Sequence, residues 1–317
     1  MHLPPPHVRC RTPVHPQWWA GLCLWTIGAD TDSAGWYRSR LSGYYLRMSE
    51  EARRNDGDNE GPLEEELEDS FDAVVSEGAE RLHRTVRTVL ITGFFGGLEV
   101  ALGVMAYLAV LDETDSHLLA GLAFGIGLVA IYLAHGELFT EDFLMPIAAV
   151  VARNGTPLQL VRLWVGTLLA NLLGGWFVMW LIAHAFPQWL EVLSESAHHF
   201  VDAPLNLQSI CLAVLGGSTM TLLTRMQQGT TSDVARIIAA MVAGFLLVGL
   251  QLFHSILDSL LIFGAIHAGA DVSYVAWIEW FGYTVLFNII GGVVLVTALR
   301  LVRTKELVKS ERDRNPE

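Results

Sequence analysis

The sequence "HGELFTEDFL" at residues 135–144 interrupts an otherwise apolar part of the chain. It follows the uncharged run "LLAGLAFGIGLVAIYLA" at 118–134 and precedes the apolar run "MPIAAVV" at 145–151. Four ionisable side chains therefore fall inside a segment long enough to cross a membrane. They are His135, Glu137, Glu141 and Asp142. Because charge is costly in lipid, the stretch predicts a break in a membrane-spanning helix whose polar groups face a vestibule, the protein interior or an adjoining subunit.

The composition of the 317-residue chain is typical of a protein with several membrane spans. Mean hydropathy is +0.40, and charged residues make up 17%, below the roughly 25% usual in soluble domains. The net charge of −13 is concentrated around residues 50–80, outside every apolar run, so it describes a solvated tail. This acidity argues against nucleic-acid binding, which needs a basic surface. The three cysteines show neither metal-ligand spacing nor a disulfide framework.

Six apolar runs can cross a hydrocarbon core of about 30 Å as helices. They are 87–111, 117–151, 159–186, 207–226, 233–264 and 275–302. The second and fifth runs exceed one crossing but are too short for two, which predicts one broken helix in each. Arginine and lysine flank the runs on alternate sides only, so the positive-inside rule predicts six spans with both termini cytoplasmic.

The sequence outside the spans divides into three regions. Residues 1–47 are either a non-native or disordered extension, with translation starting at Met48, or a weak secretory signal. Residues 48–84 predict an acidic cytoplasmic tail with an amphipathic helix. The transmembrane domain follows at 85–303, and 304–317 is a cytoplasmic C-terminal tail.

The amphipathic helix before the first span has its apolar residues on one face. They are Leu63, Leu67, Phe71, Val74 and Val75. This face is expected either on the cytoplasmic membrane surface or against neighbouring subunits. The alternative is a solvated acidic linker with some helix.

The chain contains an internal repeat. In the first half, "GELFTEDFL" is followed by "NLLGG" at 171–175, and in the second half "LQLFHSILDS" at 250–259 is followed by "NIIGG" at 288–292. The two pairs occur in the same order at nearly the same spacing, which indicates two halves of three spans. Because three is odd, the halves insert with opposite orientation, and the broken helices meet near the middle of the bilayer.

At these motifs the sequence resembles the formate/nitrite transporter family, over roughly residues 65–303. The resemblance rests on Leu138-Phe139-Thr140 in the second span and on His254-Ser255 in the fifth. It implies an all-α, aquaporin-like protomer of six transmembrane helices, with an inverted 3+3 repeat and broken helices 2 and 5. It also implies a homopentamer with one pore in each protomer.

The resemblance places ten residues along the substrate pore. His254 corresponds to the central histidine, and Thr140 to the loop threonine that bonds to it. The other eight are Leu138, Phe139, Phe124, Leu128, Asn171, Asn288, Ser255 and Asp258. A buried neutral imidazole needs a partner at each ring nitrogen, and Thr140, Ser255 and Asp258 are the candidates for His254.

Three positions depart from the family pattern. The family's formate channels carry a lysine near the extracellular entrance, where this chain has Val201 and the nearest basic candidates are His198 and His199. Phe253 stands where an acidic residue often precedes the histidine, and Asp258 stands where the family has asparagine. The changes indicate an outlying subgroup with less positive charge on the anion route.

The resemblance implies a transporter or channel for small monovalent anions of weak acids, similar to formate or nitrite. A bare carboxylate loses of order 20 kcal/mol of solvation in an apolar slit, and protonation avoids most of that. His254 is therefore expected to take part in protonation, so that the substrate crosses as the neutral acid. The protein is expected in the lipid bilayer of a bacterial or archaeal plasma membrane, with no cofactor, no metal and no enzymatic activity.

Three other functions stay open. The same scaffold could pass small neutral solutes or ammonia, which the missing lysine and Asp258 favour. A metal-ion transporter would use His135, Glu137, Glu141 and Asp142, although their spacing fits no known metal motif. A non-transporting membrane scaffold would act through the acidic tail at residues 48–80.

Overall fold

The structure is a computed structural model that describes residues 62–315, and every regular element in that range is a helix. The chain divides into two compact units, Met1–Glu65 and Glu66–Glu317, and the helical bundle belongs to the second. The expectations for residues 1–47, and for the part of the acidic tail at 48–61, lie outside the described residues.

Four of the six crossings are continuous. Three of them are α4 (Val86–Thr114), α7 (Pro157–Ala185) and α9 (Leu207–Gln228). The last crossing, Tyr274–Arg303, consists of α12 (Tyr274–Ile290), a π-helical segment (Gly291–Ala298) and α13 (Leu299–Arg303). All four are long and apolar enough to cross a membrane.

The second and fifth crossings are broken, as the sequence predicts. The second consists of α5 (His117–Ala134), a 3₁₀ turn (Phe139–Phe143) and α6 (Met145–Val151). The fifth consists of α10 (Asp233–Gly249) and α11 (Ser255–Ala268), with five residues between them at 250–254. The two breaks belong to equivalent positions of the two halves, which confirms the inverted repeat of three and three spans.

Polar side chains start most of the long helices. Each of these N-cap residues accepts a hydrogen bond from a backbone N–H in the first turn, which satisfies a donor that the helix itself leaves free. The caps are Thr85, Ser116, Thr156, Asn206, Ser232 and Ser273. Short polar stretches therefore fix where each crossing begins.

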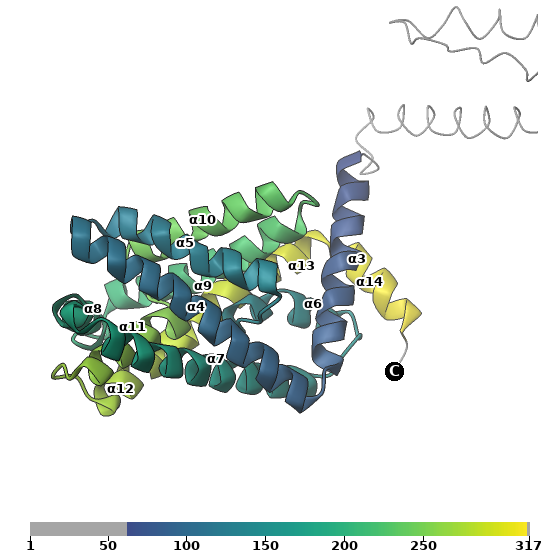
Figure 1. The fold of residues 1–317 in the computed structure, drawn as a ribbon. Helices are drawn as coiled ribbons and strands as arrows, with labels where there is room; N and C mark the ends of the chain where they lie inside the picture. Colours follow the sequence, from purple (N-terminus) through teal and green to yellow (C-terminus); the bar gives the residue numbers. More distant parts are fainter. Residues whose placement is uncertain (1–61, 316–317) are drawn as a thin grey trace, which may run out of the picture. The chain divides into compact units, whose positions relative to one another are not determined.

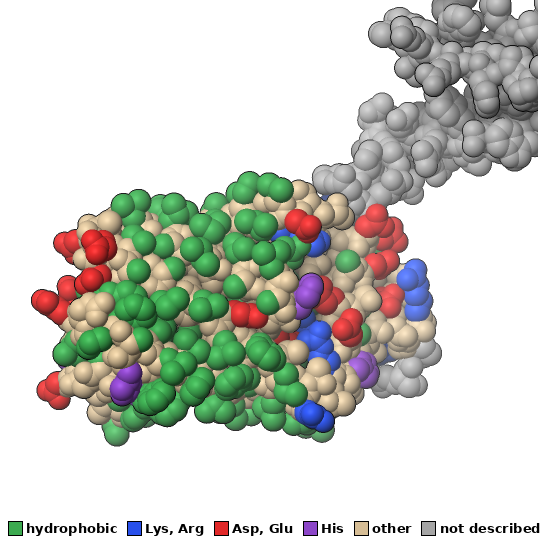
Figure 2. Space-filling model, in the orientation of Figure 1, with side chains coloured by type: hydrophobic (Ala, Val, Ile, Leu, Met, Phe, Trp, Pro, Cys, Tyr) green, Lys and Arg blue, Asp and Glu red, His purple; other side chains and the backbone are tan. Residues whose placement is uncertain are grey.

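The two ends of the bundle are covered by different helices (Figure 1). At one, called here the α3 end, α3 (Pro62–His83) and α14 (Lys305–Arg314) lie beside α6. At the other, the α8 end, the loop at residues 187–206 contains α8 (Leu190–Val201), a helix that the sequence did not predict. Figure 2 shows apolar side chains covering the body of the bundle, with Lys and Arg on this face gathered at the α3 end.

The amphipathic face of α3 packs against its own chain. Phe71, Val74 and Val75 are buried in one cluster with Leu144 and Met145 at the start of α6. The cluster also includes Ala148, Ala152 and Val308 of α14. The expectation that this face lies on the membrane surface or on a neighbouring subunit is therefore wrong for these three residues, because α6 and α14 already cover them.

Glycines allow the two halves to pack at equivalent places. A Cβ added to Gly97 would lie 2.2 Å from the backbone oxygen of Asn171, and one added to Gly217 would lie 2.0 Å from that of Asn288. Such distances are impossible for real Cβ atoms. Backbone approaches of this kind need small residues, which is a common basis of helix packing in membranes.

Gly217→Ala is expected to destabilise the bundle, because the new methyl group forces α9 away from Asn288. Overpacking of this kind costs about 1–3 kcal/mol. Thermal unfolding of the purified protein in detergent measures the effect. Gly282→Ala is the matched control, since no atom lies within 4 Å of its added Cβ and alanine favours helix. Equal losses in both variants would contradict the role given to Gly217.

Candidate transport pathway

The two breaks meet at a hydrogen bond between Thr140 and His254. The Thr140 Oγ1 atom lies 3.0 Å from His254 Nε2, and both side chains are at most 1% exposed. The N–H of Leu257 donates to His254 Nδ1 over 3.1 Å. Because an N–H group can only donate, Nδ1 must accept and the ring proton lies on Nε2. The neutral imidazole therefore donates to the Thr140 hydroxyl.

Asn171 holds the first break in place. Its Oδ1 accepts from the backbone N–H of Phe139 over 2.8 Å. Its Nδ2 donates to the carbonyl oxygens of Glu137 (2.8 Å) and Gly93 (2.7 Å). One buried amide therefore satisfies backbone groups on both sides of Leu138 and also ties them to α4.

Asn288 holds the second break in the same way. Its Oδ1 accepts from the N–H of Ser255 over 2.8 Å. Its Nδ2 donates to the carbonyl oxygens of Phe253 (2.9 Å) and Ala213 (2.7 Å). The repeat seen in the sequence is thus a repeat of hydrogen bonds, in which each asparagine bridges one broken helix and one continuous helix.

The remaining pore candidates are buried but differ in their surroundings. Phe124, Leu128 and Leu138 belong to the main apolar core and are at most 3% exposed. The Phe139 ring packs edge-on against Trp164, with 6.1 Å between centroids. The Ser255 hydroxyl, also fully buried, makes no hydrogen bond within the described residues. It does not contact the imidazole nitrogens, so it is not the ring partner that the sequence left open.

Asp258 is turned back toward the second break. Its Oδ2 accepts from the backbone N–H of His254 over 2.7 Å, and the side chain is 1% exposed. It bonds the backbone rather than the imidazole, so Leu257 supplies the second ring partner instead. No feature of the sequence other than its position four residues after His254 indicated this contact.

The histidines of α8 do not replace the missing lysine with a fixed charge. His198 Nδ1 lies 2.8 Å from Asp202 Oδ2, so any charge it gains is compensated. The His199 ring lies 6.0 Å from the ring of Phe253. Partial burial, and then the nearby His117, lower the pKa of His199 below its usual 6.5. Its ring is therefore neutral at neutral pH.

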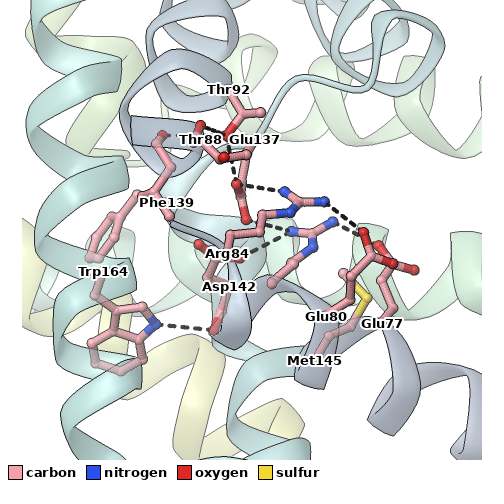
Figure 3. Close-up of polar contacts among 12 residues, drawn as sticks. Glu77, Glu80, Arg84, Thr88, Thr92, Glu137, Phe139, Asp142, Met145 and Trp164 are labelled. Atoms are coloured by element: carbon pink, nitrogen blue, oxygen red, sulfur yellow. Dashed lines mark hydrogen bonds and ion pairs between the residues drawn. The ribbon is translucent and has the colours of Figure 1, made fainter. Parts of the chain in front are cut away.

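Two arginines of the α3–α4 junction bind the carboxylates of "HGELFTEDFL" (Figure 3). Arg81 Nη1 donates to Asp142 Oδ1 over 3.0 Å and lies 3.8 Å from Glu137 Oε1. Arg84 Nη1 donates to Glu137 Oε2 over 2.9 Å, and the Thr92 hydroxyl donates to the same oxygen. The sequence predicted that these acids face a vestibule, the protein interior or an adjoining subunit, but it did not identify the arginines as their partners.

The charged side chains at this junction are unusually deeply buried. The side chains of Glu137 and Asp142 are 1% and 0% exposed, and that of Arg81 is 11% exposed. Burial alone lowers the pKa of Arg81, but the carboxylates of Asp142, Glu137 and Glu77 raise it above its ordinary value. Arg81 therefore stays charged and neutralises part of the buried acid cluster.

The arginines also bear on the metal-transport alternative. They form ion pairs with Asp142 and Glu137, two of the four residues proposed as metal ligands. Among residues 62–315, no group of three or more His, Cys, Asp or Glu side chains is placed to hold a metal ion.

A cavity of about 520 Å³ opens at the α3 end beneath this junction. Its wall includes Arg81, Arg84 and Arg236, and also the acids Glu77, Glu80 and Glu141. Glu141 directly follows Thr140, so the cavity reaches the loop that carries the central hydrogen bond. His135 also lines it, at the left-handed C-cap of α5.

Residues 68–302 match the family model described as Formate/nitrite transporter. The chain belongs to this family. It is 23% identical over 235 residues to the formate channel BtFdhC of Bacillus thuringiensis, an alignment that covers 69% of this chain and 88% of that protein. The resemblance noted from the motifs is therefore confirmed.

Solved structures agree with the fold. A structure described as an FNT family ion channel matches with a TM-score of 0.66 and 19% identity, covering 73% of this chain and 96% of that one. A pentameric formate channel with formate bound matches with a TM-score of 0.61 and 22% identity, covering 69% and 97%. The family match and the long apolar helices make this formate/nitrite transporter a multi-pass membrane channel or transporter.

Asn171→Asp is expected to disrupt this transporter, because a carboxylate accepts at Phe139 but cannot donate to the carbonyls of Glu137 and Gly93. Buried unsatisfied groups cost about 1–3 kcal/mol each. Thermal unfolding in detergent and reconstituted flux are the measurements. Asn206→Asp is the control, since aspartate caps α9 as well as asparagine does. A normal Asn171→Asp protein would show that the break holds without the two donated bonds.

Arg81→Ala leaves the buried Asp142 without its cation, which typically destabilises by about 3–5 kcal/mol. The variant should unfold at a clearly lower temperature in detergent. Arg314→Ala removes the same side chain from an ion pair with Glu311, where the arginine is 64% exposed. That change should cost less than about 1 kcal/mol. Similar melting temperatures for both variants would contradict a supporting role for Arg81.

Proposed function

We propose that this chain moves small monovalent anions of weak acids, of the formate and nitrite class, as the neutral acid past Thr140 and His254. The hydrogen bond between these two residues carries the proposal. It puts two polar groups at the junction of two broken helices, inside an otherwise apolar core. Polar groups at such a depth are costly and are usually functional.

The apolar surroundings favour a neutral permeant. Phe124, Leu128 and Leu138 exclude water from the approach to Thr140, so an ion would lose its hydration there. The idealised loss for a carboxylate is of order 20 kcal/mol. A formate-like acid has a pKa near the ordinary carboxyl value of about 4, and a low dielectric raises it. Taking up a proton before the constriction is therefore the less costly route.

His254 takes part in this protonation through its two ring nitrogens. Nε2 carries the proton that is donated to Thr140, whereas Nδ1 accepts from Leu257. The ring becomes charged only if a proton displaces the Leu257 N–H from Nδ1. An anion beside the imidazole stabilises that charged form, so the proton and the anion favour each other's presence. Thr140 keeps the ring in the orientation that this exchange needs.

The membrane orientation follows from charge. The loops at the α8 end, residues 112–116, 186–206 and 269–273, contain no lysine or arginine. The α3 end carries the basic residues, which puts both termini of the membrane domain in the cytoplasm and the cavity of about 520 Å³ at the cytoplasmic mouth. The plasma membrane of a bacterium or archaeon is the proposed location.

The functional unit is proposed to be a homopentamer with a pore in each protomer. The similarity to a pentameric formate channel supports this assembly. Many large apolar side chains on the outside of the bundle are also available for lipid or for a neighbouring protomer. Examples are Phe95, Leu102, Ile126, Leu133 and Leu173, each at least 45% exposed.

A channel for ammonia or small neutral solutes is the second candidate. It is favoured by the weak positive charge at the α8 end, where His198 pairs with Asp202 and His199 is neutral. Asp258, behind His254, adds an acidic group to the route rather than a basic one. A neutral permeant or a weak base would not be held back by either feature.

Flux into proteoliposomes distinguishes the two candidates. Formate, nitrite, hydrosulfide, acetate and ammonia are compared for the wild type and His254→Asn. Weak-acid uptake should rise about tenfold for each pH unit of acidification, as the neutral fraction does above its pKa. It should fall strongly in His254→Asn and stay unchanged in His184→Asn, whose histidine is exposed at the end of α7. Faster flux of ammonia than of any acid would support the second candidate, and undiminished weak-acid uptake in His254→Asn would refute the histidine role.

A further inference from the structure

Asp258 is one of the most deeply buried acids of the bundle, and the arginines do not neutralise it as they do Asp142. It stands in the first turn of α11, where Oδ2 accepts the N–H of His254. The titratable groups facing it are Tyr107 of α4, Tyr283 of α12 and, beyond Tyr107, Glu195 of α8. None of these groups supplies a positive charge.

The fourth helix packed against α11 is also without charge at this place. α7 meets α11 through Gly175, which lies against Leu260, and Met179, which lies against Gly264. The carboxyl group therefore experiences two opposing effects. Burial favours its neutral form, whereas the His254 N–H and the N-terminus of α11 favour the carboxylate.

A small cavity connects Asp258 with the α8 end. Its volume is about 10 Å³, the space of roughly one water molecule. Four polar side chains line it, and the rest of its wall is mostly apolar. They are Asp258, Tyr107, Ser196 and Gln251. A water there has the two to four polar partners that buried waters need.

The polar connection continues outward from this cavity. The Tyr107 hydroxyl lies 3.2 Å from Nδ1 of His117, the first residue of α5, which is half-buried at the α8 end. His117, Tyr107 and Asp258 therefore form a line of exchangeable groups from the membrane surface to the residue that caps His254. Leu252 in the second break and Leu257 in the first turn of α11 line the same cavity, so it reaches the break.

The residue type at position 258 adds a chemical argument. An asparagine would accept the His254 N–H equally well, so the cap does not require an acid. Compared with an amide, the carboxyl group adds the ability to bind and release a proton, and with it a negative charge.

We propose that Asp258 is the proton-carrying group of transport, loaded from the α8 end through the cavity lined by Tyr107. The inference rests on the proposed function and names the source of its proton. The O–H bond of protonated Asp258 breaks as an O–H bond to the substrate anion forms, leaving a carboxylate and a neutral acid. The acid releases the proton to water in the cavity at the α3 end, and Asp258 is reprotonated from the α8 end. One proton and one anion move together in each cycle.

Asp258→Asn tests the proposal without removing the acceptor for the His254 N–H. Proteoliposomes containing a trapped pH dye report proton uptake driven by formate. The variant should unfold near the wild-type temperature, whereas its formate-coupled proton uptake should fall about 10²-fold, within the range of a positioned acid. If the variant takes up formate and protons as the wild type does, with the same pH profile, the proposal is overturned. Asp258 would then serve only as the acceptor for the His254 N–H.

Tyr107→Phe tests the proposed access route. Loss of the hydroxyl should slow formate-coupled proton uptake by about tenfold, a smaller effect than loss of the acid itself. Tyr274→Phe is the matched control, because its hydroxyl bonds to Trp176 away from the cavity. Equal rates in Tyr107→Phe and Tyr274→Phe would overturn the route.

A measurement without substrate separates this proposal from the proposed function. Infrared difference spectra of the wild-type protein between acidic and alkaline samples should contain a carboxylic acid signal that Asp258→Asn lacks. The signal would support proton binding at Asp258 even if none of the weak acids in the flux panel were transported. Identical spectra for the two proteins would show that Asp258 does not exchange a proton, and would overturn the inference whatever the substrate.

Discussion

The whole pore region depends on how two broken helices satisfy their backbone at a depth without bulk water. Asn171 and Asn288 each accept one N–H and donate to two carbonyl groups, so each break is held by the side-chain amide of its own asparagine. Backbone groups left unpaired in the membrane would each cost several kcal/mol. The glycines beside the asparagines permit the close approach on which these bonds depend. These bonds hold the two breaks where Thr140 Oγ1 and His254 Nε2 lie 3.0 Å apart.

The charges of "HGELFTEDFL" have a different purpose from the groups at the pore centre. Arg81 and Arg84 hold Glu137 and Asp142 from the side of α3, so the loop is braced from the N-terminal helix as well as from α7. Glu141 alone of the three acids faces the cavity at the α3 end. Support of the loop and contact with the cavity at the α3 end are therefore divided between neighbouring residues of one short stretch.

Several features were predictable because they depend on local sequence. Run length and the two interrupted runs predicted six crossings with breaks at the second and fifth, and the paired motifs predicted the repeat. The family resemblance carried by these motifs implied that Thr140 bonds to His254, whereas the residues alone left Ser255 and Asp258 open as ring partners. In contrast, α8, the π-helical segment Gly291–Ala298 and the packing of α3 on α6 were missed. The packing of α3 depends on which neighbour covers its apolar face, and periodicity cannot distinguish a lipid from a second helix.

The sequence by itself determined that this protein crosses the membrane six times, with an inverted repeat, since hydropathy and charge act residue by residue along the chain. Only the tertiary structure decided which groups are paired. The ion pairs of Arg81 and Arg84 with Asp142 and Glu137 join residues whose spacing along the chain has no meaning until the helices pack. The same holds for Tyr107 and Asp258, which line one cavity. Protonation and hydrogen bonding depend on distances of a few ångströms, which are set by the fold.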